Sequence, residues 1–291
     1  MNVPYLLFYH LKSGSTFMRY FKGDFLLLLS LCLISHIAFA QSGLPSKGFG
    51  RYFLIAHRGG VVDSTNAENS LPALQDAIER GYWMVEMDLR LTRDSVLIIH
   101  HDPDFKRYYG VEKAVSAMTW DEISQLRSAR GNQVMKLEDA LSACSGKIQV
   151  MLDNKISGND TLLFSQVVSL LQKYGLDKQA LMIGTDESTD YFTGKIKLSC
   201  TRQQLEINTQ KPGYSPEYYY LFGETGSMTD DDVKWAQYQG IMVVGVLNMF
   251  RYKGKKGKSR PYLAAARDAT RLKSLGVQFF QLDSEFDRFF R

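Results

Sequence analysis

Three acidic residues of this sequence could together bind a metal ion. Glu86 and Asp88 are separated by one residue within an apolar segment, and side chains two positions apart on a β-strand face the same side. Asp153, at the end of another apolar segment, could supply a third carboxylate. Ligand sets made only of oxygen suit hard cations such as Ca²⁺ or Mg²⁺. For Glu86 and Asp88 alone, the alternative is solvated charge at the rim of a sheet.

Two histidines and two cationic residues could act on a phosphate group beside such a cation. His57 directly follows an apolar segment, and His101 is followed by Asp102. Histidine exchanges protons near neutral pH, so the two could serve as the general acid and general base of one displacement. Arg58 could bind a phosphate through two parallel hydrogen bonds. Lys155, two residues after the third carboxylate, could contact an anionic substrate.

The residues beside these histidines have more than one interpretation. His100 precedes His101, and neighbours on a strand face opposite sides, so we expect His100 to face the surrounding helices as a packed or surface histidine. Asp102 could orient His101 or cap the following turn. Gly59 and Gly60 have no Cβ and would let the backbone approach a ligand.

The candidate residues follow segments that alternate between strand and helix patterns. Alternation over about 250 residues is typical of an α/β fold with parallel strands, and a single (β/α)₈ TIM barrel has this length. The loops that follow the strands carry the chemistry in such a barrel. The expected strands are 52–56, 84–92, 96–100, 148–153, 181–184, 197–200, 218–222, 242–247 and 279–283, and the expected helices are 71–78, 137–143, 162–174, 230–238 and 262–274.

Several motifs, in this order and spacing, resemble the glycerophosphodiester phosphodiesterase family. They are HRGG at 57–60, AENS at 67–70, VEMDLRLTRD at 85–94, HHD at 100–102, DNK at 153–155 and VLN at 246–248, with a closing segment at 276–283. The resemblance covers about residues 51–285. It implies a TIM-barrel phosphodiesterase that cleaves glycerophosphodiesters to an alcohol and glycerol phosphate.

The resemblance also implies a role for individual residues. One divalent cation, Ca²⁺ or Mg²⁺, would be bound by Glu86, Asp88 and Asp153, with His57 and His101 as the acid–base pair. The residues implied to bind the substrate or support its site are Arg58, Lys155, Glu68 and Asn248.

Some positions depart from the family pattern. Asp153 stands where glutamate is usual, and the aromatic residue that usually precedes Asn248 is absent. The insertion expected at about 103–135 is short, which predicts a shallow, open cleft. A phospholipase D-like or phosphoinositide-cleaving enzyme on the same barrel is therefore an alternative. A catalytically silent protein that binds phosphorylated ligands is another.

The N-terminal segment is typical of a secretory signal peptide. Arg19 and Lys22 precede an apolar run at 25–40 that ends in Ala-Phe-Ala. We expect cleavage after Ala40, a mature domain at 41–291, and a periplasmic or secreted protein. A membrane anchor is the alternative, but the run is shorter than the ~20 residues that a spanning helix needs. Met18 is an alternative start.

Composition and charge narrow the range of partners. With 45% hydrophobic and 23% charged residues, a disordered chain is excluded. The net charge of +4 is too small to indicate nucleic acid, so we expect a small-molecule or lipid-derived phosphodiester as substrate. The basic run 253–260 could make transient contact with a membrane surface, or be a solvated loop. The sequence leaves open the oligomeric state and whether Cys144 and Cys200 pair.

Overall fold

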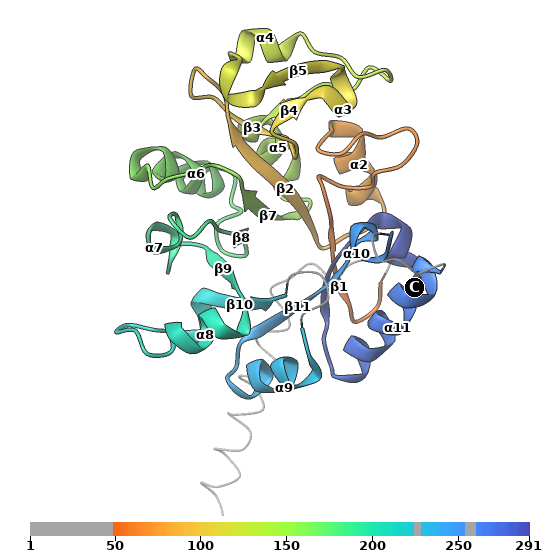
Figure 1. Cartoon of the computed structure of the whole chain (residues 1–291), viewed down its shortest axis with the longest axis vertical. Helices are drawn as coiled ribbons and strands as arrows, with labels where there is room; N and C mark the ends of the chain where they lie inside the picture. The colour runs from red at the N-terminus through yellow and green to blue at the C-terminus, as the bar shows by residue number, and fades with distance from the viewer. Residues whose placement is uncertain (1–48, 224–227, 254–259) are drawn as a thin grey trace, which may run out of the picture. The chain divides into compact units, whose positions relative to one another are not determined.

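Eight parallel strands form a closed barrel in the computed structural model, which describes residues 49–223, 228–253 and 260–291 (Figure 1). Each strand pairs with the next along the chain, and the last strand pairs with the first, which closes the barrel. The strands are β1 (Phe53–Ala56), β2 (Met84–Leu91), β7 (Gln149–Asn154), β8 (Leu181–Ile183), β9 (Lys197–Cys200), β10 (Tyr219–Phe222), β11 (Met242–Leu247) and β12 (Phe279–Leu282). The predicted TIM-barrel architecture is confirmed.

Helices follow the strands and pack against their outer faces, and polar side chains fix where several of them begin. Ser70 and Asp160 accept hydrogen bonds from backbone N–H groups at the starts of α2 and α6. Thr201 and Thr229 form capping boxes at α8 and α9. The helices of the barrel are α2 (Leu71–Glu79), α5 (Leu137–Cys144), α6 (Thr161–Lys173), α7 (Thr189–Phe192), α8 (Arg202–Asn208), α9 (Asp230–Tyr238), α10 (Met249–Lys253) and α11 (Pro261–Ser274).

A layer of apolar side chains fills the barrel interior beneath the candidate site. This buried cluster comprises Ile55, Met84, Met151, Leu181, Tyr220 and Val244, each from a different barrel strand. Because alternate residues of a strand share a face, the residue two positions further along points into the barrel one layer higher. That step leads from Ile55 to His57, from Met84 to Glu86 and from Met151 to Asp153.

The segment expected as a strand at 96–100 does not belong to the barrel. It forms β3 (Leu97–Ile99), which is antiparallel to β2 and pairs with β6 (Met135–Lys136) on its other side. The physical reason is the length of the preceding turn, residues 93–95. Such a tight turn can join antiparallel strands, whereas a parallel neighbour needs a crossover of a dozen or more residues.

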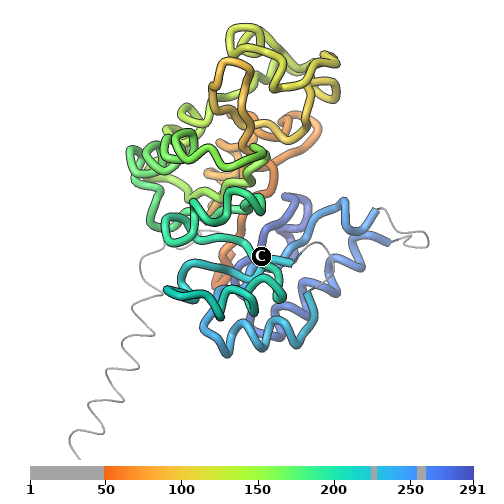
Figure 2. The backbone as a smooth tube through the Cα atoms, turned by 60° about the vertical axis from the view of Figure 1, so that its left-hand side comes forward, coloured from red at the N-terminus to blue at the C-terminus, as the bar shows by residue number. Residues whose placement is uncertain are grey.

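An insertion between β3 and β6 has an apolar core of its own. It contains β4 (Asp104–Phe105), α3 (Lys106–Tyr109), β5 (Val111–Ala114), a 3₁₀ turn at Val115–Ala117 and α4 (Trp120–Ser124). Phe105, Val115, Met118 and Ile123 are buried together with Ile98 of β3. In both views the insertion, coloured yellow, lies at the end of the domain away from α9 and α11 (Figures 1 and 2).

The predicted signal peptide, residues 1–40, lies outside the described residues, as does most of the basic run 253–260. Within the described ranges, no helix has the length and apolar character needed to cross a membrane.

Candidate active site

Three carboxylates converge at the carboxyl ends of two adjacent strands. Glu86 and Asp88 extend from β2, and Asp153 extends from β7, where it pairs in register with Asp88. One oxygen of each carboxylate lies within 4.8 Å of an oxygen of the other two. Glu86 and Asp88 are each only 1% exposed, so the cluster opens to solvent on the side of Asp153. The proximity expected from strand geometry is present.

Electrostatics favour a cation at this cluster. Burial raises the pKa of Glu86 well above its usual value, and the charges of Asp88 and Asp153 raise it further. Burial likewise raises the pKa of Asp153, against the opposing effect of Lys155. A bound divalent cation would offset both the burial and the repulsion of these carboxylates. Oxygen-only ligands at this spacing fit Ca²⁺ or Mg²⁺.

Hydrogen bonds from the protein orient two of these carboxylates. The backbone N–H of Arg58 donates to Glu86 Oε2 at 2.7 Å, and Asn69 Nδ2 donates to Asp88 Oδ2 at 3.0 Å. Partners of this kind fix the direction of metal ligands. Asn69 lies inside the AENS motif, but no motif or spacing pairs it with Asp88. Its φ of 51° places it in the left-handed region, which asparagine tolerates better than most residues.

His57 is held by the last strand of the barrel. Its Nδ1 lies 2.6 Å from Asp283 Oδ1, and its Nε2 lies 3.9 Å from Glu86 Oε2. The backbone N–H of Met249 donates to the second oxygen of Asp283 at 2.5 Å. Burial tends to raise the pKa of Asp283, but the hydrogen bond and charge of His57 outweigh it and lower the pKa. Asp283 lies at the end of the expected strand 279–283, but no motif in the sequence pairs it with His57.

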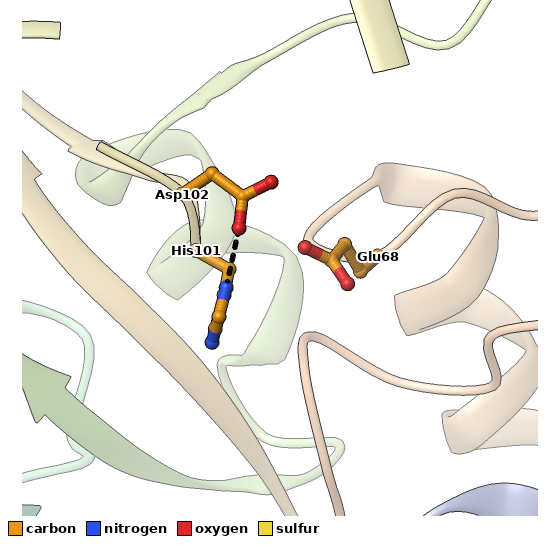
Figure 3. A group of neighbouring side chains, drawn as sticks. All are labelled: Glu68, His101 and Asp102. Carbon is orange, nitrogen blue, oxygen red and sulfur yellow. Dashed lines mark hydrogen bonds and ion pairs between the residues drawn. The ribbon is translucent and has the colours of Figure 1, made fainter. Parts of the chain in front are cut away.

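His101 is held in a similar way by its neighbour in the sequence. Its Nδ1 lies 2.8 Å from Asp102 Oδ1, as Figure 3 shows. On the other side of the ring, Arg58 Nη2 lies 3.2 Å from Nε2. The side chain of His101 is 29% exposed, so the imidazole borders both the site and solvent. From the sequence, Asp102 could either orient His101 or cap the following turn, and this contact agrees with the first role.

Glu68 faces the same pair from the loop that precedes α2 (Figure 3). Its side chain is only 2% exposed, and its oxygens accept hydrogen bonds from Arg58 Nη1 at 2.9 Å and from the Tyr108 hydroxyl at 3.2 Å. The guanidinium of Arg107 also contacts Glu68. A buried carboxylate with two arginine partners is compensated in charge, so Glu68 serves to hold Arg58 rather than to approach an anionic substrate.

Arg58 carries a buried hydrogen-bond donor that no described protein group satisfies. Among the described residues, its buried Nε has no hydrogen-bond partner. A buried N–H without a partner is costly unless a ligand or water satisfies it. An oxyanion of a substrate phosphate would supply an acceptor at this position.

The two glycines after Arg58 serve helix packing. A Cβ on Gly59 would lie 2.5 Å from the Cα of Asn69, and one on Gly60 would lie 2.1 Å from the carbonyl oxygen of Ala73 in α2. Both glycines also have positive φ angles, 82° and 136°. They are required because the start of α2 lies against this loop, and the expectation that they allow approach to a ligand has no support here.

The remaining predicted site residues, Lys155 and Asn248, lie at the ends of β7 and β11. Lys155 Nζ contacts the carboxylate of Asp153 and lies 3.5 Å from Asp88 Oδ1, so it borders the acidic cluster. Asn248 Oδ1 accepts a hydrogen bond from the backbone N–H of Arg251 at 3.2 Å, at the start of α10. This contact gives Asn248 a local structural role whatever it does toward substrate.

His100 points away from the carboxylate cluster, but into the insertion rather than toward the barrel helices. It is 4% exposed, its Nε2 lies 2.8 Å from the carbonyl oxygen of Asp104, and its ring packs 4.6 Å from that of Phe105. Burial lowers the pKa of His100, which favours the neutral ring in this environment. His100 is packed, as expected. Its neighbours belong to the insertion and not to the barrel helices, because β3 lies outside the barrel.

Comparison with known proteins finds a family match over part of the chain. Residues 57–192 match the glycerophosphoryl diester phosphodiesterase family. The predicted family resemblance is confirmed. A probable glycerophosphodiester phosphodiesterase of Mycobacterium tuberculosis is 32% identical over 107 residues, which cover 36% of this chain and 40% of that protein. A human lysophospholipase D is 28% identical over 133 residues, 41% of each chain. The matches thus span about two fifths of the length of these curated relatives.

Solved structures of the family share the fold over most of the chain. A glycerophosphoryl diester phosphodiesterase from Parabacteroides distasonis superposes with a TM-score of 0.65 at 17% identity, covering 84% of this chain and 86% of that one. An Oleispira antarctica phosphodiesterase, solved in complex with the product sn-glycerol-3-phosphate, gives a TM-score of 0.63 at 17% identity and covers 81% and 96%. At this identity the likeness supports the fold alone.

Proposed function

We propose that this protein is a metal-dependent phosphodiesterase that hydrolyses glycerophosphodiesters to an alcohol and glycerol phosphate. The observation that carries the proposal is the arrangement of His57 and His101 around the carboxylate cluster. The Nδ1 atom of each ring contacts a carboxylate, and Nε2 is directed back toward site residues. Two rings oriented in this way can act as the general acid and the general base of one displacement.

The acidic cluster would bind one divalent cation, Ca²⁺ or Mg²⁺, through Glu86, Asp88 and Asp153. When bound, that cation supplies positive charge that polarises the phosphoryl oxygens and lowers the pKa of the attacking group. Lys155 would add a second positive charge beside the phosphate, and Arg58 would donate hydrogen bonds to it.

The histidines would move protons at their Nε2 atoms. One ring would remove a proton from the nucleophile, and the other would give a proton to the departing alcohol. Asp283 and Asp102 would keep the Nδ1 proton of each ring in place, so that Nε2 is presented to the substrate in a defined orientation. The nucleophile is water or a neighbouring hydroxyl of the glycerol. Detection of a cyclic glycerol phosphate intermediate would identify the hydroxyl.

A second substrate class, lysophospholipids, is favoured by the relatives named lysophospholipase D. The two classes share the glycerol phosphodiester and differ in the acyl chain. An acyl chain requires access from a membrane or micelle, for which the basic run 253–260 would be suited. That run lies mostly outside the described residues, so soluble glycerophosphodiesters are the leading proposal.

A substrate panel on the purified mature protein tests the function. Glycerophosphocholine, glycerophosphoethanolamine, lysophosphatidylcholine and intact phosphatidylcholine would each be assayed for release of the alcohol, with and without a chelator. We expect turnover of the soluble diesters, abolished by chelation and restored by Ca²⁺ or Mg²⁺. Full turnover after exhaustive chelation would contradict the metal requirement. Binding without turnover of any substrate would instead support a silent phospho-ligand binding protein.

We also propose, from the N-terminal sequence, that the mature enzyme is periplasmic or secreted. Its diester substrates would then be those released from lipids outside the cytoplasmic membrane.

A further inference from the structure

The insertion contributes the guanidinium of Arg107 to the network around both Arg58 and His101. Arg107 lies on α3, within the segment whose apolar core is separate from that of the barrel. Its guanidinium nevertheless extends to two carboxylates of the candidate site, Asp102 and Glu68. The sequence motifs gave no role to Arg107.

The planar guanidinium of Arg107 donates several hydrogen bonds at once. Its Nε donates to Asp102 Oδ2 at 2.6 Å, and its Nη2 donates to Asp102 Oδ1 at 2.8 Å. The same Nη2 contacts Glu68. The guanidinium also lies 4.7 Å from the ring centroid of Tyr108, whose hydroxyl donates to Glu68. A lysine ammonium could supply the charge but not two parallel bonds in one plane.

Each of the two carboxylates holds a residue that is proposed to act on the substrate. Asp102 accepts from Nδ1 of His101, and Glu68 accepts from Nη1 of Arg58. Arg107 therefore links the loop after β3 to the loop before α2, which are otherwise separate parts of the chain. The carboxylates of Asp102 and Glu68 must themselves be fixed, because a carboxylate that can rotate would not hold an imidazole or a guanidinium in one orientation.

The charge state of Asp102 agrees with this arrangement. Burial tends to raise the pKa of Asp102, but hydrogen bonds from Arg107 and His101 outweigh it and lower the pKa to about 2. Asp102 therefore remains a carboxylate at any pH at which the protein would work, and it accepts from both partners at once.

We propose that Arg107 is a positioning residue, through which the insertion fixes the orientation of His101 and of Arg58. The expected effect on kcat rests on the proposed function, whereas the expected effect on the orientation of His101 does not. The barrel strands hold the carboxylate cluster and, through Asp283, His57, whereas His101 and Arg58 depend on a guanidinium from the insertion. The insertion would thereby act on catalysis through this side chain.

The test compares Arg107→Gln and Arg107→Lys with Arg127→Gln, a matched control in the same part of the chain. The guanidinium of Arg127 bonds to the carbonyl oxygens of Ser124 and Leu126 and to the side-chain amide oxygen of Gln133, none of which belongs to the candidate site. The first readout is the imidazole ¹⁵N spectrum of the mature protein, in which His57, His100 and His101 are the only histidines. The second is the kinetics of a diester, and the third is cation binding by calorimetry.

For Arg107→Gln we expect the His101 signals to lose the single Nδ1–H tautomer, and kcat to fall about 10–100-fold, as is usual when a group that orients a site residue is removed. Cation affinity should stay unchanged, because Arg107 makes no contact with the carboxylate cluster. Arg107→Lys should recover only part of the loss, and Arg127→Gln should match the wild type in all three measurements.

The inference would be overturned if Arg107→Gln, shown to be folded, kept both the wild-type His101 spectrum and the wild-type kcat. It would also be overturned if Arg107→Lys restored both completely, since charge alone would then suffice, or if Arg127→Gln caused an equal loss. If the wild type turned over no diester, the proposed function would fail, while the ¹⁵N spectra would still decide the positioning role.

Discussion

Asp88 and Asp153 occupy paired positions on adjacent parallel strands, so the separation of these two carboxylates is set by the backbone ladder of β2 and β7. Parallel strands lie about 4.8 Å apart. Two side chains of equal length projecting from paired positions remain near that distance, which is close enough to share one cation. The shorter aspartate at position 153 is thus compatible with the cluster.

Replacement of Asp153 tests its part in cation binding. Asp153→Glu retains the carboxylate and should leave Ca²⁺ or Mg²⁺ affinity within about tenfold of the wild type, whereas Asp153→Asn should weaken it by at least about tenfold. Titration calorimetry measures both. Asp177→Asn, which alters an aspartate paired with Lys178, serves as the control. Undiminished binding by Asp153→Asn would remove this residue from the ligand set.

The contact between Asp283 and His57 predicts a defect in the chemical step. Asp283→Asn should leave the fold intact but weaken the orientation of the ring, lowering kcat by about 10²-fold or more. KM should change much less, because Asp283 contacts His57 Nδ1 and the Met249 N–H and is not among the residues proposed to bind the phosphate. Kinetics on glycerophosphocholine measure the split. The nearby exposed Glu285→Gln, which loses only its contact with Tyr262, should behave as the wild type. Equal kcat values for the two variants would exclude a role for Asp283.

The adjacent histidines should respond in different ways to replacement by alanine. His101→Ala should lower kcat by at least about 10²-fold for a diester with a poor leaving group. If His101 is the general acid, the loss of kcat should be smaller for an activated aryl diester. If it is the general base, kcat should fall by the same factor for both diesters.

His100→Ala should mainly affect stability, by about 1–3 kcal/mol, because it removes a buried hydrogen bond to the Asp104 carbonyl. Chemical denaturation measures that loss. Equal losses of kcat in His100→Ala and His101→Ala, both shown to be folded, would contradict the assignment.

The two cysteines of the described chain should be unreactive in the native protein. Both are free and buried, and burial raises the pKa of Cys144 to about 12 and that of Cys200 to about 11. A raised thiol pKa means that the protonated form persists at pH 8, with a thiolate fraction on the order of 10⁻³ or less. Mass spectrometry after iodoacetamide treatment should show labelling only in urea. Rapid native labelling, or a disulfide between them, would contradict this prediction.

Export remains a prediction from the N-terminal sequence. Mass spectrometry of the protein from its native host should find a chain that begins at Gln41. An uncleaved chain in the cytoplasm would count against both the signal peptide and the proposed location.

The barrel could be predicted because its strands are apolar, short and regularly separated by helical periods. The segment 96–100 was placed wrongly in the alternation, since its apolar pattern alone does not distinguish a parallel from an antiparallel partner. The short helices α7 and α8 were missed because four to seven residues complete too few turns for a period to emerge. The Thr201 and Gln204 capping box was the available signal for α8.

Site residues that lie within recognisable motifs could be predicted from the sequence. Contacts between residues far apart in the sequence could not. Glu86, Asp88 and Asp153 converge as strand periodicity required. Asp283 lies 226 residues from His57 in the sequence, and only closure of the barrel brings the two together. Arg107 belongs to an insertion whose fold cannot be derived from the alternation of the barrel.

The pairing of β1 with β12 has a consequence for when the site is completed. The first strand of the described chain bears His57 at its end, and the last bears Asp283, with the parallel register Ala56 to Leu282 between them. During synthesis, β2 and β7 with the residues of the carboxylate cluster emerge well before β12 is available. His57 acquires its partner only once the final strand has docked, so full activity would report completion of the entire barrel.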